Sequence, residues 1–200
     1  MFLWIGIILE VLVFILCPGI SILSGISGVL GVFSVVLCSQ RKLSQFIFSF
    51  LQLFTYSWLV FQEKFWGELV ENVFYFITMI LGVYLWRSKS ERGKIKTREL
   101  GKVWGSIIFL GNILGILALW IILKETNDPQ PLLDSITTVP AFIAQILMMT
   151  RFRENWIYWL IIDLGSIIMW WKAEDYCMVT QFIYWSANCI YGWILWRKTD

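Results

Sequence analysis

The sequence predicts an all-α polytopic membrane protein, and three observations carry this prediction. Of its 200 residues, 58% are hydrophobic and only 15% are charged, whereas roughly 25% of residues are charged in ordinary soluble domains. The apolar residues form eight segments, most of them close to the roughly 17 to 25 residues that span a bilayer as a helix. The basic residues gather on alternate loops between these segments. A soluble domain of this length could not bury so much apolar surface.

The predicted helices follow the apolar segments in order. The first segment, residues 2–16, is short, and Pro18 and Gly19 separate it from the second because both residues interrupt helices. Two placements are open for it: an extra N-terminal helix across the membrane, or a helix at the membrane surface. The other segments span residues 20–38, 44–61, 68–86, 103–123, 135–149, 154–171 and 177–196.

The distribution of basic residues predicts the orientation in the membrane. Loops on the cytoplasmic side carry an excess of Lys and Arg. Thirteen of the 16 basic residues lie in four alternate loops, so we expect these loops and the C-terminus to be cytoplasmic, and also the N-terminus if residues 2–16 span the membrane. The thirteen are Arg41, Lys42, Arg87, Lys89, Arg92, Lys94, Lys96, Arg98, Lys102, Arg151, Arg153, Arg197 and Lys198.

The chain also contains an internal repeat. The run Gly82-Val83-Tyr84-Leu85-Trp86-Arg87 resembles Gly192-Trp193-Ile194-Leu195-Trp196-Arg197, which lies 110 residues later without a gap. Each repeat begins outside and ends inside, so the two run parallel about a pseudo-two-fold axis along the membrane normal. Transporters use such repeats, with the substrate site between them near the middle of the membrane. A duplication retained only for packing is the alternative.

The repeat predicts a 3+1+3 helical bundle with an extra N-terminal helix. Residues 1–19 form that helix, residues 20–86 the first three-helix repeat, and residues 135–200 the second. Residues 87–134 form a basic cytoplasmic loop followed by a linker helix.

The strongest candidate for a site lies in the segment 154–171. Trp156, Trp159 and Asp163 stand at i, i+3 and i+7 and therefore share one helical face. An acid near the middle of the membrane costs roughly 2.5 to 3.5 kcal/mol on insertion scales, so it is expected to have a function. Aromatic rings beside a carboxylate suit a cationic or aromatic ring through stacking and cation–π attraction.

Further polar residues lie on neighbouring predicted helices. Gln181, Tyr184, Asn188 and Tyr191 form a stripe on one face of 177–196, and Gln145 lies near the cytoplasmic end of 135–149. Polar side chains in a membrane need partners on other helices or a water-lined cavity. Both explanations are open for any single residue, whereas the whole stripe favours a cavity.

The residues that are missing exclude several functions. The sequence has no histidine, which removes Ser-His and Cys-His nucleophile pairs, His-ligated zinc and an axial haem histidine. The four cysteines show no C-x-x-C spacing, so neither a metal site nor a disulfide framework is expected. We therefore expect no enzyme activity, no cofactor and no nucleic-acid partner. A structural or partner-binding membrane subunit is the alternative to a transporter.

The signature around Asp163 resembles a known family. Trp156-x-x-Trp159-x-x-x-Asp163, preceded by Arg153-Glu154-Asn155, is similar to the W-x-x-W-x-x-x-N signature of the PnuC family of vitamin transporters. The runs 147–151 and 191–196 look similar to that family too, and the likeness covers about residues 24–197. It implies a fold related to the SWEET sugar transporters, a homotrimer, and a location in the bacterial inner membrane.

The resemblance also implies a function. The family carries nicotinamide riboside by facilitated diffusion, and a cytosolic kinase traps the substrate by phosphorylation; branches of the family carry thiamine or riboflavin. By this resemblance Trp156, Trp159 and Asp163 line the substrate site. The polar pattern of the neighbouring helices adds Gln145, Gln181, Tyr184 and Asn188 as candidate hydrogen-bonding residues.

Asp163 departs from the signature, which has asparagine at this position. An amide both donates and accepts hydrogen bonds, whereas an ionised carboxylate only accepts them. Nicotinamide riboside is a cation with a carboxamide, and thiamine combines a cationic ring with an aminopyrimidine. The aspartate therefore moves the expectation towards thiamine, but nicotinamide riboside still ranks first and both substrates remain open.

Overall fold

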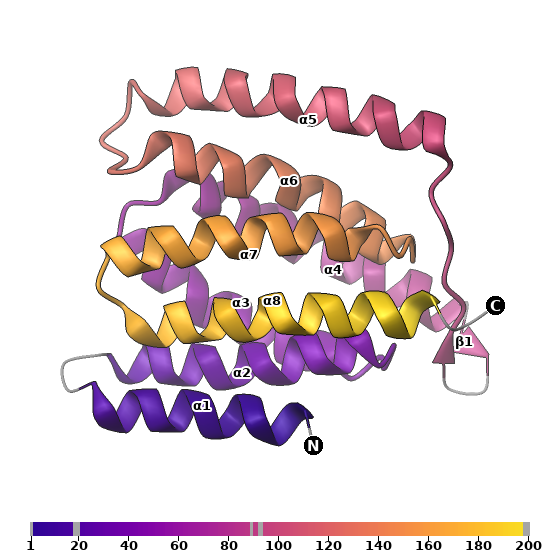
Figure 1. Cartoon of the computed structure of the whole chain (residues 1–200), viewed down its shortest axis with the longest axis horizontal. Helices are drawn as coiled ribbons and strands as arrows, with labels where there is room; N and C mark the ends of the chain where they lie inside the picture. The colour runs from indigo at the N-terminus through magenta and orange to yellow at the C-terminus, as the bar shows by residue number, and fades with distance from the viewer. Residues whose placement is uncertain (1, 18–20, 89, 92–93, 198–200) are drawn as a thin grey trace.

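The computed structural model describes residues 2–17, 21–88, 90–91 and 94–197, and among them it contains eight α-helices and one β-hairpin (Figure 1). The helices are α1 (Phe2–Leu16), α2 (Ile22–Ser39), α3 (Gln45–Gln62), α4 (Trp66–Ser88), α5 (Lys102–Leu123), α6 (Pro131–Met149), α7 (Asn155–Lys172) and α8 (Tyr176–Arg197). The hairpin pairs β1 (Ser90–Glu91) with β2 (Lys94–Ile95) in antiparallel fashion.

The predicted all-helical class is confirmed, and each predicted segment corresponds to one helix. The largest difference is at α6, which begins at Pro131 instead of residue 135. Proline is favoured at the start of a helix, because the N–H that it lacks would have no partner there. The hairpin was not predicted, since strands of two residues leave no periodic pattern in the sequence.

The turns between helices recur at the 110-residue spacing of the predicted repeat. Arg41 (φ 61°) and Arg151 (φ 70°) follow α2 and α6, while Lys64 and Glu174 (both φ 59°) follow α3 and α7. Left-handed backbone is uncommon for residues other than glycine, so two matched pairs at one spacing support the repeat. The two-fold relation between the triplet α2–α4 and the triplet α6–α8 stays a prediction.

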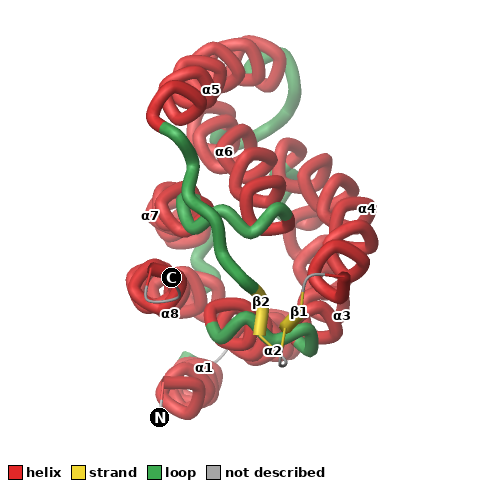
Figure 2. The backbone as a smooth tube through the Cα atoms, turned by 90° about the vertical axis from the view of Figure 1, so that its right-hand side faces the viewer, coloured by secondary structure: helices red, strands yellow, loops and turns green. Residues whose placement is uncertain are grey.

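The helices pack in sequence order within each triplet. α3 lies between α2 and α4, and α7 lies between α6 and α8. The triplets meet where α2 packs on α8 and where α4 packs on α6. α1 lies against α2 and α8, while α5 lies at the edge of the bundle on α6 (Figures 1 and 2).

The surface of the bundle is apolar, as a protein surrounded by lipid requires. By length and composition, four of the described helices, α2, α4, α5 and α6, can cross a membrane. On α5, Ile107, Leu110 and Leu114 are exposed, and they form a hydrocarbon surface suited to lipid. The helices α3, α7 and α8 also carry glutamine, asparagine or aspartate on their buried faces. The molecule is a multi-pass membrane protein.

The two ends of the bundle differ in charge. We call one the basic end; α2, α4, α6 and α8 finish there, on the right of Figure 1, and it carries Arg41, Arg98, Arg151, Arg153 and Arg197. The opposite, acidic end carries the loops with Glu63, Asp128, Glu174 and Asp175.

Candidate functional site

A cavity of about 120 Å³ lies between the two triplets, and we call it the central cavity. All six helices of the triplets contribute to its wall, whereas α1 and α5 do not. The lining residues are Ser34, Val35, Cys38, Gln45, Ser49, Gln52, Leu53, Tyr75, Met79, Gln145, Met148, Trp156, Trp159, Asp163, Trp185, Asn188 and Cys189.

Five of the seven residues that the sequence singled out lie in this wall: Gln145, Trp156, Trp159, Asp163 and Asn188. They come from all three helices of the second triplet. The common helical face of the two tryptophans and Asp163 therefore faces the space between the triplets, where a repeat-built transporter is expected to hold its substrate.

Gln181 and Tyr184 are not part of this wall, although both are buried in α8. Gln181 packs against Gly31 of α2, where an added Cβ would lie 3.0 Å from the amide oxygen. The ring of Tyr184 covers Gly6 of α1, where an added Cβ would lie 2.6 Å from the ring. The polar stripe of α8 is thus divided among several neighbours, because α8 contacts α1, α2 and α7.

Asp163 is the acid of the central cavity. It is 1% exposed, and its Oδ2 accepts a hydrogen bond from the Cys189 thiol at 3.3 Å. The ion pairs found among the described residues both involve Arg153 at the basic end. Asp163 therefore has no basic partner in the described part of the chain, and a cationic ligand would supply one.

The aromatic part of the wall combines both triplets. The rings of Trp159 and Tyr75 approach with centroids 5.9 Å apart and planes inclined by 57°. Trp185 also lines the cavity, and it stands 110 residues after Tyr75. Flat aromatic faces next to a carboxylate suit a cationic aromatic ring.

Several buried polar atoms in the wall have no hydrogen-bond partner among the described residues. They include Gln45 Nε2, Trp156 Nε1, Trp185 Nε1 and Asn188 Oδ1. Buried polar groups are normally satisfied, so such atoms need an explanation. Here these four provide three donors and one acceptor for a ligand with amide and hydroxyl groups. The amide nitrogen of Gln145, by contrast, already donates to Thr78 Oγ1 at 3.0 Å.

Equivalent positions of the two repeats face each other across the cavity, but their chemistry differs. Six pairs of lining positions are 110 residues apart, and in three of them the second triplet has an amide, an indole or an acid where the first has an aliphatic side chain or a serine. These three are Val35 with Gln145, Ser49 with Trp159, and Leu53 with Asp163. Both triplets contribute polar residues to the wall, but the second triplet alone contributes tryptophans and an acid.

The sequence reasoning did not place Gln45, Tyr75 and Trp185 among the site residues. Tyr75 and Trp185 could have been found from the repeat, because they occupy equivalent positions in the two aligned runs. Gln45 is the first residue of α3, and a polar residue at a segment boundary gives no signal that it faces inward.

The basic end of the cavity is closed by packed side chains. Trp86 and Trp196 occupy equivalent positions in the two repeats, and both are at most 2% exposed. Each donates from its indole to the opposite triplet, Trp86 to Met148 O at 3.3 Å and Trp196 to Ser39 O at 3.2 Å. These reciprocal bonds hold the triplets together between the central cavity and the loops.

A segment that we call the strap, residues 94–100, crosses this end (Figure 2). Its Ile95 is 2% exposed and packs in one cluster with Trp86, Trp156 and Trp196. Arg41 of the first triplet donates to Ile95 O at 3.3 Å. The strap therefore adds an apolar side chain to the layer that closes the cavity.

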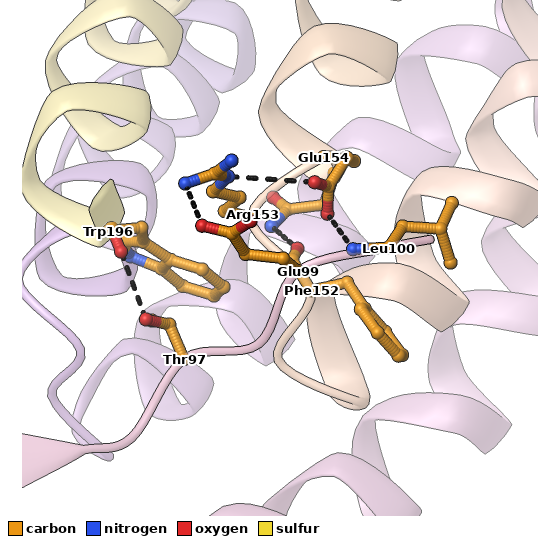
Figure 3. Close-up of polar contacts among 8 residues, drawn as sticks. Thr97, Glu99, Leu100, Phe152, Arg153, Glu154 and Trp196 are labelled. Atoms are coloured by element: carbon orange, nitrogen blue, oxygen red, sulfur yellow. Dashed lines mark hydrogen bonds and ion pairs between the residues drawn. The ribbon is translucent and has the colours of Figure 1, made fainter. Parts of the chain in front are cut away.

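The strap is also bound to the turn between α6 and α7 (Figure 3). Arg98 N donates to Arg151 O at 2.8 Å, and Arg153 N donates to Arg98 O at 3.0 Å. Leu100 N donates to Glu154 Oε2 at 3.0 Å, and Glu99 forms an ion pair with Arg153. Since Arg41 binds the same segment from the other side, the strap connects both triplets.

An all-helical bundle with a polar, aromatic cavity between two three-helix units is the architecture of a membrane transporter. The chain belongs to the nicotinamide mononucleotide transporter family, whose sequence model matches residues 21–198. This confirms the family resemblance that the signature predicted.

Relatives with known names match over most of the chain. The nicotinamide riboside transporter PnuC of Neisseria mucosa is 24% identical over 203 residues, which cover 95% of this chain and 77% of the relative. The protein of the same name from Haemophilus influenzae is 27% identical over 184 residues, covering 89% of this chain and 80% of the relative. The crystal structure of the vitamin B3 transporter PnuC superposes with a TM-score of 0.85 at 24% identity, covering 98% of this chain and 89% of that one. The fold is therefore that of this transporter.

Proposed function

We propose that the protein carries nicotinamide riboside across the membrane by facilitated diffusion and has no catalytic activity of its own. The names of its relatives support this substrate, and the central cavity supports it chemically. The main observation is the buried Asp163, without a basic partner in the described part of the chain, beside the aromatic pair Trp159 and Tyr75.

In this proposal, the charged nicotinamide ring lies against Trp159, and Asp163 is its counter-ion. The donors Gln45 Nε2 and Trp156 Nε1 and the acceptor Asn188 Oδ1 serve the carboxamide and the ribose hydroxyls. Gln181 and Tyr184 have no place in this proposal, because they do not line the cavity.

Transport would proceed by rocking of one triplet against the other. Opening towards the basic end requires the reciprocal bonds of Trp86 and Trp196 to break and the strap to leave at least one triplet. We take the basic end to be cytoplasmic, in the inner membrane of a bacterium, because basic loops stay on that side. The homotrimer and the cytosolic kinase that the resemblance implies stay predictions.

Thiamine is the second candidate, and one observation favours it. The family signature has asparagine where this chain has Asp163, and a carboxylate can accept hydrogen bonds from the amino group of the aminopyrimidine. Riboflavin ranks third, because it has no positive charge to pair with Asp163.

The test is calorimetric binding of the purified protein to nicotinamide riboside, thiamine and riboflavin side by side, followed by uptake into vesicles. We expect the tightest binding for nicotinamide riboside and an uptake that ignores imposed proton and sodium gradients. Accumulation driven by a gradient would contradict passive transport. Absence of binding and of thermal stabilisation by all three vitamins would favour a structural subunit.

A further inference from the structure

A second, smaller cavity of about 50 Å³ adjoins the central cavity on the side of the acidic end. The two cavities share Tyr75, Trp159 and Asp163 in their walls. The smaller one, which we call the acidic cavity, is also lined by Glu68 and Glu71 of α4. A ligand could thus pass from one cavity to the other along the same aromatic faces.

The acidic cavity is lined by acidic side chains that have no basic partner among the described residues. Glu68, Glu71 and Asp163 line it, and none of the described lysines and arginines lines either cavity. Glu68 and Glu71 are 2% and 6% exposed, and neither forms an ion pair with a described residue. Burying a carboxylate without a cationic partner is costly.

The acids near the acidic cavity differ in the hydrogen bonds that they accept from the protein. Asp134 accepts from Gly67 N at 2.7 Å and Glu68 N at 3.0 Å, so it caps α4 and its charge is compensated there. Glu68 accepts a hydrogen bond from the Tyr56 hydroxyl, which in turn accepts one from Trp170. Both acids therefore have a structural role.

Glu71 has the Tyr75 hydroxyl as a side-chain neighbour, but its Oε2 accepts no hydrogen bond from a described residue. It lies one turn after Glu68 and one turn before Tyr75 on α4, and all three line the acidic cavity. The neighbouring Asn72 is 3% exposed and lines the same cavity, and its Nδ2 has no acceptor among the described residues. An unpartnered amide beside a buried acid marks a place for a ligand with both a positive charge and an acceptor oxygen.

We propose that Glu71 and Asn72 form an access site that binds the positively charged ring of the substrate before it reaches Trp159 and Asp163. The ligand is an organic cation, a pyridinium carboxamide in the first instance. The described residues contain no group of three or more metal-ligating side chains that could hold a metal ion. Tyr75 and Trp159 line both cavities, so a flat cation keeps an aromatic contact during its passage.

This inference rests on the proposed function, and the test separates the two. Uptake of nicotinamide riboside is compared with uptake of its dihydro form, which has nearly the same shape but an uncharged ring. For Glu71→Gln we expect the initial uptake rate of the cation to fall about tenfold, because a buried counter-charge is lost. The rate for the dihydro form should change less than about twofold.

A matched control removes the same charge elsewhere. Glu125 is exposed in the loop between α5 and α6 at the same end of the bundle, and Glu125→Gln should leave both rates unchanged. Calorimetry of Glu71→Gln with nicotinamide riboside should still detect the central site, which shows that the variant is folded.

Two results would overturn the access site. Equal slowing of both forms by Glu71→Gln would assign Glu71 a structural role, and unchanged rates for both would remove it from the pathway. If the wild type carries thiamine instead, the proposed substrate is wrong, but Glu71→Gln must still slow the uptake of that cation. A wild type that carries neither cation contradicts the access site together with the proposed function.

Discussion

The two ends of the cavity system differ in how their polar groups are paired. At the basic end, charged and polar groups contact protein: Arg41 and Arg153 bind the strap, and Trp86 and Trp196 donate across the triplets. Towards the acidic end, Glu71 and Asp163 are buried without basic partners among the described residues. The basic end is held closed by contacts within the protein, whereas the acidic side has the chemistry to receive a cation.

This difference explains how a passive carrier could use binding to change its shape. A ligand can shift a conformational equilibrium only by its differential affinity for the two states. On the acidic side, the affinity for a cation comes from buried acids without basic partners. To open the basic end, the free energy of binding must outweigh the contacts of the strap, Trp86 and Trp196. Each substitution below is chosen to weaken either the binding of the cation or the contacts that close the basic end.

The largest effect is expected at Asp163. Asp163→Ala should weaken binding of nicotinamide riboside at least about 100-fold, because the buried counter-charge of the ring is lost. Calorimetry on the purified variant checks this. Unchanged affinity would show that Asp163 does not contact the substrate. Asp163→Asn removes the same charge but keeps a hydrogen-bonding side chain that matches the family signature, so it should weaken nicotinamide riboside binding less than Asp163→Ala does, and thiamine binding more than nicotinamide riboside binding.

A glycine beside the site provides the next test. At Gly192 an added Cβ would lie 2.5 Å from the ring of Trp156, so Gly192→Ala must displace that ring. We expect about tenfold weaker binding and a loss of stability of about 1 to 3 kcal/mol, as overpacking typically costs.

Gly111→Ala is the control for this substitution, because nothing lies within 4 Å of its added Cβ on α5. It should leave binding unchanged and should not lower stability, because alanine is more favourable than glycine inside a helix. If Gly192→Ala and the wild type bind with equal affinity, Trp156 does not contribute to substrate binding.

The strap should contribute to stability and closure through Ile95. Ile95→Ala removes a fully buried side chain, and we expect a loss of about 2 to 5 kcal/mol in the free energy of unfolding. Loosening this layer should also speed the reaction of Cys38, which lines the central cavity, with a maleimide. Ile107→Ala, an exposed site on α5, is the matched control. Equal stability of Ile95→Ala and Ile107→Ala would show that the strap does not stabilise the closed end and is only a connection between α4 and α5.

The smallest effect is expected at the ion pair of the strap. The side chain of Glu99 is 54% exposed, and exposed ion pairs contribute only about 0 to 1 kcal/mol. Glu99→Gln should therefore lower the melting temperature only slightly, because the backbone bonds of Arg98 and Leu100 remain. A large loss would show that this pair, and not Ile95, holds the strap.

The sequence predicted the helices and five residues that line the central cavity, because both predictions depend on periodicity. Trp156, Trp159 and Asp163 share one face of α7, and that face lines the central cavity. The side chains of α8 were harder to place, since α8 has neighbours on several sides and Tyr184 packs against α1 instead of the cavity.

The strap was not predicted, because its tertiary contacts have no periodic signal. The one indication was Ile95, a single large apolar residue within a run of basic residues. The burial of Glu71 could not be predicted either, because an acid one turn from a helix start is equally compatible with reaching out to water.

The most direct test is a crystal structure of the protein with nicotinamide riboside bound. We predict density for the nicotinamide ring against Trp159, with the ring within reach of the Asp163 carboxylate and the ribose between the two triplets. Density for the substrate outside the central cavity, at a concentration that saturates binding in calorimetry, would contradict the account.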